Sequence, residues 1–122
     1  GTLASTVEMS GGVLDVDESL TISGTLIQGG DVTIDVAEDK VLTYYRYSPL
    51  LSGRTLSLGP NTLTLTGGGT FVNPNGGLEL NHPNSKLLLS SITVDKVITR
   101  VDDSLGLDVD NNSTVSSFLV AH

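Results

Sequence analysis

The feature that most constrains this chain is a repeated pattern of two short apolar strands joined by a polar turn. Successive copies begin 20, 22, 22 and 29 residues apart, while the turn varies from three to six residues. A period of about 22 residues is typical of one coil of a three-faced parallel β-helix. The five copies are LDV-DES-LTI, IDV-AEDK-VLT, LSL-GPNT-LTL, LEL-NHPNSK-LLL and LDV-DNNST-VSS, which begin at Leu14, Ile34, Leu56, Leu78 and Leu107.

Alternation of apolar and polar residues dominates the chain, and helical periodicity is nearly absent. A single coil of three short strands cannot hide its inward apolar residues, whereas stacking coils about 4.8 Å apart pairs the backbones and extends the core. The sequence therefore predicts one all-β domain over residues 1–122, a right-handed parallel β-helix (β-solenoid) of about five coils. The alternative is a β-sandwich or jelly roll. It is less favoured because Asn75-Gly76 is the only tight hairpin signal.

Composition excludes several classes of function. The chain has no cysteine, and its 6 basic and 14 acidic residues give a net charge of -8. This balance argues against nucleic-acid binding and against adsorption to anionic lipid. No stretch approaches the roughly 18 apolar residues of a membrane span, so membrane insertion is not expected. The start, Gly1 to Ser5, is neither an initiator methionine nor a signal peptide, which favours a fragment of a larger repetitive surface protein.

The stretch from Asn61 to Phe71, NTLTLTGGGTF, resembles the β-helical passengers of bacterial adhesins and autotransporters. Gly77 to Leu80 and Gly106 to Asp110 have the same style, and the likeness of rhythm and composition covers most of residues 12–120. The resemblance implies an extracellular or cell-surface location and a repetitive stalk or adhesive surface. It implies no catalytic residues.

The most unusual stretch is Tyr44-Tyr45-Arg46-Tyr47, which contains all three tyrosines. Tyrosine and arginine side chains stack on sugar rings and hydrogen-bond to them. This stretch is therefore the candidate site for a cell-surface glycan. The alternative is that alternate tyrosines are buried against a strand.

Asp108, Asp110, Asn111 and Asn112 offer oxygen ligands at short spacing, as calcium sites do. Asp15, Asp17 and Glu18 hold the corresponding place in the first repeat. EF-hand spacing is missing, and Asp and Asn are also common turn residues, so turn chemistry is the alternative. No cofactor other than calcium is predicted.

The pair Asp102-Asp103 is the only hint of acid–base catalysis. Adjacent residues of a strand point to opposite faces, so the two carboxylates do not converge. We therefore predict a non-enzymatic structural or adhesive module for spacing, display or self-assembly. Unpaired strand edges at both ends would join other copies or neighbouring repeats. A carbohydrate-binding module and a polysaccharide-active enzyme are the alternative functions.

Overall fold

The computed structural model describes residues 1–44, 56–101 and 103–121. Within these ranges all the regular elements are strands, and every strand pair is parallel. Neighbouring strands in a β-sandwich are antiparallel. The predicted β-solenoid is therefore confirmed, and the sandwich alternative is wrong.

The strands form three faces of the solenoid. Face 1 contains β1 (Thr2–Leu3), β4 (Leu20–Ile22), β7 (Val41–Tyr44) and the first parts of β10 (Thr70–Leu80), β12 (Thr93–Val101) and β14 (Thr114–Ala121). Face 2 contains β2 (Val7–Met9), β5 (Leu26–Gln28), β8 (Leu56–Ser57) and the second parts of β10, β12 and β14. Face 3 contains β3 (Gly12–Val16), β6 (Val32–Val36), β9 (Thr62–Thr66), β11 (Lys86–Ser90) and β13 (Gly106–Val109).

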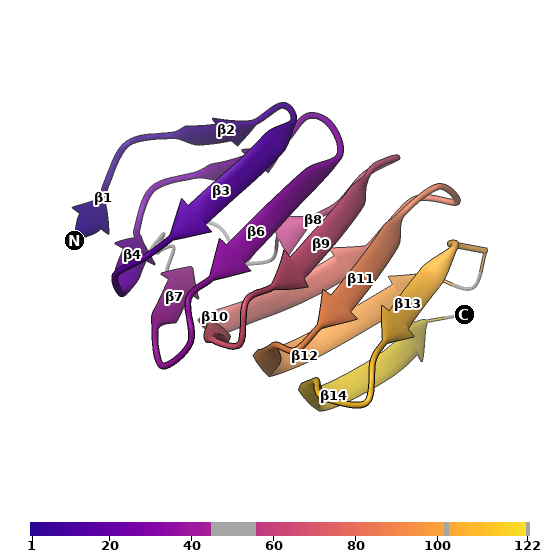
Figure 1. Ribbon diagram of the computed structural model, residues 1–122. Coiled ribbons are helices and arrows are strands. Elements are labelled where there is room, and N and C mark those ends of the chain that lie inside the picture. Colours follow the sequence, from indigo (N-terminus) through magenta and orange to yellow (C-terminus); the bar gives the residue numbers. More distant parts are fainter. Residues whose placement is uncertain (45–55, 102, 122) are drawn as a thin grey trace.

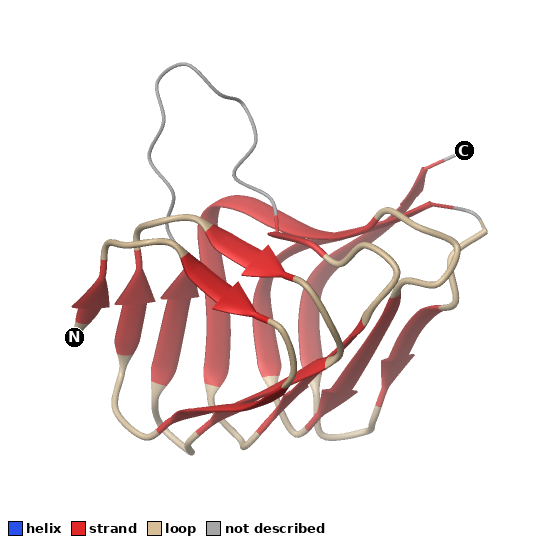
Figure 2. Cartoon of the chain, turned by 90° about the horizontal axis from the view of Figure 1, so that it is seen from above, coloured by secondary structure: helices blue, strands red, loops and turns tan. Residues whose placement is uncertain are grey.

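A coil consists of one pass over the three faces, so the five strands of face 3 mark five coils. Figure 1 shows the face 3 strands side by side, in chain order from β3 to β13. Figure 2 shows that the chain begins at one end of this stack and finishes at the other. We number the coils 1 to 5 from the end that carries β3. β14 lies beyond coil 5 on faces 1 and 2.

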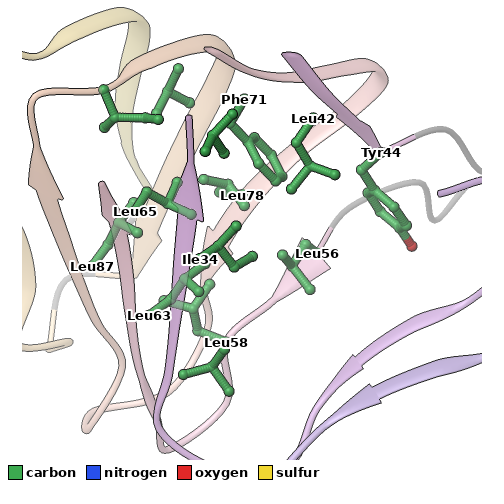
Figure 3. Packing of buried hydrophobic residues seen from close by; sticks show 14 of the residues in the cluster. Ile34, Leu42, Tyr44, Leu56, Leu58, Leu63, Leu65, Phe71, Leu78 and Leu87 are labelled. Atoms are coloured by element: carbon green, nitrogen blue, oxygen red, sulfur yellow. The ribbon is translucent and has the colours of Figure 1, made fainter. Parts of the chain in front are cut away.

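The core consists of inward-facing columns that run along the stack. On face 3, in-register pairing places Leu14, Ile34, Leu65, Leu89 and Val109 in one column. On face 1 a second column contains Leu20, Leu42, Phe71, Val94 and Val115. The middle members of both columns are fully buried, and Figure 3 shows Leu42, Phe71, Ile34 and Leu65 in the shared interior. Each such side chain contributes about 1.5–3 kcal/mol of hydrophobic stabilisation.

The register differs from the predicted one after coil 2. Leu14 and Ile34 are neighbours, as expected, but the next residue in their column is Leu65 and not Leu56. Leu56 pairs with Leu78 on face 2, and Leu107 pairs with Leu87 on face 3. The predicted series of five equivalent starts is therefore wrong.

The reason is the unequal length of the coils. Face 3 repeats after 20 residues from Leu14 to Ile34, after 31 from Ile34 to Leu65, after 24 to Leu89 and after 20 to Val109. The long interval includes residues 45–55, which fall between β7 and β8. This extra length moves the apolar-turn-apolar pattern from one corner of the solenoid to another.

Glycine at the corner between faces 2 and 3 lets coils 1 and 2 approach closely. A Cβ atom added at Gly30 would overlap the backbone carbonyl of Ser10. At the adjacent Gly29, an added Cβ would meet only the ends of two side chains, Glu8 Oε1 at 3.4 Å and Ser10 Oγ at 3.9 Å. The close approach thus depends on Gly30, while Gly29 is free to carry a side chain.

Truncation of a central column residue tests the stacked core. We expect Leu65→Ala, at a fully buried position, to lower the free energy of unfolding by about 2–5 kcal/mol, because it leaves a cavity between coils. Thr64→Ala, on the outward side of the same strand, should change it by no more than about 0.5 kcal/mol. Urea denaturation measures both, and equal effects would contradict the inward columns.

A pair of glycine substitutions tests the coil contact. Gly30→Ala should destabilise the protein by about 1–3 kcal/mol, because the methyl group forces coils 1 and 2 apart. Gly29→Ala is the matched control and should stay within about 0.5 kcal/mol of the parent. If both variants unfold at the same urea concentration as the parent, coils 1 and 2 are not packed as described.

Candidate functional site

The predicted glycan site has one member in the described structure. Tyr44 lies on β7 and is 1% exposed, and its ring points into the core beside Leu56 (Figure 3). It continues the column of Ile22 on face 1. Tyr44 is therefore a core residue, which agrees with the alternative that alternate tyrosines are buried against a strand. Tyr45, Arg46 and Tyr47 lie outside the described residues, so their role stays a prediction.

The predicted calcium ligands are on β13 and at the corner that follows it. Asp108 points outward from β13, and its carboxylate lies 3.4 Å from Nζ of Lys86. Both carboxylate oxygens of Asp110 accept the Ser91 N–H at 3.1 Å, and Oδ1 also accepts the Asn112 N–H and the Ser113 hydroxyl. Asn111 and Asn112 are exposed in the turn.

These contacts give Asp110 a structural role, since it ties the corner after β13 to the corner after β11. The hydroxyl of Ser113 and the backbone N–H of Ser91 hold the pKa of Asp110 below its ordinary value. Among residues 1–44, 56–101 and 103–121, no group of three or more His, Cys, Asp or Glu side chains could hold a metal ion. Calcium binding stays a prediction.

Other corners have similar polar links between coils. Thr62 donates its backbone N–H to Oδ1 of Asp31 at 2.8 Å, and Gly59 donates to Oδ1 of Asn81 at 2.8 Å. Val41 donates to the Ser19 hydroxyl at 3.1 Å. Each link joins a side chain of one coil to the backbone of the next. The Asp, Asn and Ser residues of the turns therefore fix the register of the coils.

The two ends of the stack are the most distinctive surface of the molecule, because the inward columns reach them without a cap. Leu3 begins the column of Ile22 and is 41% exposed, although Ile22 is fully buried. At the other end, Phe118 follows the fully buried Ile98 and is 40% exposed. Val109 follows Leu89 and is 43% exposed. Leu3, Phe118 and Val109 are therefore exposed members of the core columns.

Among the described residues, backbone groups at both ends also lack a pairing strand. Gly106 and Asp110 donate their N–H groups to the carbonyls of Ser85 and Leu89 in the preceding coil. Because N–H groups alternate in direction along a strand, those of Leu107 and Val109 point away from the stack. At the first coil, Val16 accepts from Ala37 of coil 2, so the N–H groups of Val13 and Asp15 point outward along the axis. Each end thus presents an edge to which another strand can be added.

One position near the second end of the stack carries a charged group between Leu80 of β10 and Val120 of β14. Arg100 stands in register with Leu80 on face 2, and Nε and Nη2 donate to the hydroxyl and carbonyl of Ser104 at 3.0 and 2.7 Å. Gly106 lies directly beside the guanidinium group. This contact occupies the corner between faces 2 and 3, and nothing in the residue pattern of the sequence predicted it.

A scan against protein-family models, a search of curated proteins and a search of solved structures each found no match to this chain. In the part of the chain that the structure describes, no helix is long and apolar enough to cross a membrane.

The Asp110 contacts predict a pH-dependent link between coils. The pKa of Asp110 is lowered in the folded state, so its carboxylate stabilises the fold at any pH above the unfolded-state pKa of about 3.9. This stabilisation is lost as the pH falls through the lower, folded-state pKa. We expect Asp110→Asn to lower the urea midpoint most at a pH of about 6, with the deficit shrinking below about 3.9.

The matched control is Asp17→Asn. Asp17 is exposed at the same corner in coil 1 and makes no hydrogen bond with any described residue. Its midpoint should follow that of the parent protein across the pH range. An Asp110→Asn deficit that is constant from acid to neutral pH would argue against the carboxylate as the acceptor that matters.

Proposed function

We propose that this chain is a non-enzymatic structural and adhesive module of an extracellular surface protein, in which neighbouring coils complete the ends of the solenoid. The observation that carries the proposal is the exposure of column residues at both ends, where Leu3, Val109 and Phe118 are at least 40% exposed. Isolated solenoids need terminal repeats with a polar outer face to stay soluble. Ends of this kind suit a segment within a longer stack.

The shape of the molecule suits the same role. Five coils, joined by unbroken parallel pairing on faces 1 and 3, make a rod whose ends lie far apart in the sequence. Such a rod spaces and displays what is attached to it, and the outward side chains form a repetitive surface. Repetition along the axis supports adhesion through many weak contacts.

Neither alternative function gains a specific observation. For the glycan hypothesis, Tyr44 is buried in the core, and the other three candidate residues, Tyr45, Arg46 and Tyr47, lie outside the described residues. For the polysaccharide-active enzyme, Arg100 is held by Ser104, and Asp102 lies outside the described residues. The structural and adhesive module therefore leads.

Light scattering tests end-to-end joining. Acidic copies repel one another at low salt, whereas salt of about 1 M reduces the screening length to about 3 Å. We expect the mass to equal one chain at low salt and to rise with protein concentration at high salt. A mass of one chain under all conditions would contradict joining through the ends.

An edge variant locates the joining surface. Val109→Pro removes an N–H that points away from the stack and blocks strand addition at β13, while leaving the β11 pairing intact. Val109→Thr keeps the N–H and the shape of the side chain. The proline variant should associate less than the threonine variant at high salt, once circular dichroism has shown that both are folded.

A further inference from the structure

Charge is segregated along the axis of the solenoid. Residues 1–39 contain eight carboxylate side chains and no lysine or arginine, whereas residues 40–122 contain six of each sign. The whole net charge of -8 therefore belongs to the first two coils and the corner that follows them. In coil 1 the acidic residues Glu8, Asp15, Asp17 and Glu18 are all exposed.

Little within the described structure neutralises this charge. Glu18 lies 3.3 Å from Nζ of Lys40, and both side chains are solvent-accessible. Asp15 stands directly beside Asp35 in the in-register pairing of β3 and β6. Like charges opposite each other in neighbouring strands are unfavourable. A positively charged group at this end would therefore be attracted.

The same end has a hollow of about 190 Å³ between β2 and β3. Its apolar lining includes Val7, Met9, Leu14 and Val32. At the same end, the column of Leu107, Leu87, Leu63 and Val32 finishes at Gly12, which has no side chain. An aliphatic side chain from an added strand would occupy the missing place in this column.

A second copy of the chain does not suit this end electrostatically. Two first coils would place four exposed carboxylates against four. The opposite end is not complementary either, because residues 86–121 contain three basic and five acidic side chains, a net charge of -2. A partner with positive side chains fits better than either end of another copy.

We propose that the first coil binds a polypeptide segment in which aliphatic residues alternate with lysine or arginine, added as a strand beside β3. This inference rests on the proposed function and names the partner of one end. The outward N–H groups of Val13 and Asp15 pair with the backbone of the segment. Its aliphatic residues enter the hollow beside Leu14, and its basic residues lie along the outward face beside Asp15.

Two short synthetic peptides test the proposal, one alternating valine with lysine and the other alternating valine with glutamate. At low salt the lysine peptide should bind at least about tenfold more tightly, as expected for a few exposed ion pairs. The difference should shrink as salt is added. Fluorescence anisotropy of labelled peptides gives the affinities, and hydrogen exchange should show new protection at residues 8–16.

Variants of the protein locate the binding site. Val13→Pro removes an outward N–H at an exposed position and should abolish binding, while Val13→Thr should keep it. The triple variant Asp15→Asn, Asp17→Asn, Glu18→Gln should weaken binding of the lysine peptide about tenfold. The matched control, Asp103→Asn with Asp108→Asn, neutralises the other end and should leave binding unchanged.

The inference is overturned if neither peptide binds, if both bind equally, or if protection appears at β13 and β14. These results are separable from the light-scattering test. A chain that joins end to end at high salt but prefers neither peptide keeps the proposed function and loses this inference. If the chain binds the lysine peptide through β3 but never joins other copies, the peptide site stands and end-to-end joining of copies does not.

Discussion

The structure depends on the in-register stacking of one coil upon the next. None of the short strands could bury its apolar side chains alone, and the backbone groups of each are paired only by the coils on either side. The other features of the fold serve this contact. Aliphatic columns such as Ile34, Leu65 and Leu89 fill the interior, Gly30 permits close approach, and carboxylates such as Asp31 and Asp110 tie the corners together.

Much of the fold could be predicted because strand alternation and coil stacking leave a direct trace in the sequence. The LDV and IDV motifs at Leu14 and Ile34 do occupy neighbouring places in one column. The register beyond Ile34 could not be predicted, because the three faces use the same alternation of apolar and polar residues. Leu56 begins a motif and Leu65 completes a similar one. The strand pairing places Leu56 on face 2 and Leu65 on face 3.

The candidate sites were harder to predict than the fold. Tyr44 is an inward position of β7, and its burial follows from its place beside Ile22, which the sequence does not reveal. Asp110 is a predicted calcium ligand, and the sequence does not reveal that its oxygens also accept N–H groups from Ser91 and Asn112. The sequence shows that no basic residue precedes Lys40. Only the structure shows that these acidic residues gather at one exposed end of the stack.

The pairing of each coil with its immediate neighbours has a consequence for how the molecule tolerates change. In the described residues, strands pair only with strands of the adjacent coils, and on face 2 the pairing is interrupted between β5 and β8. A defect in one coil therefore weakens two interfaces and leaves more distant ones intact, as in other repeat architectures. Substitutions can therefore accumulate in one coil at a time. A long solenoid of this kind can lose stability locally while its other coils stay folded.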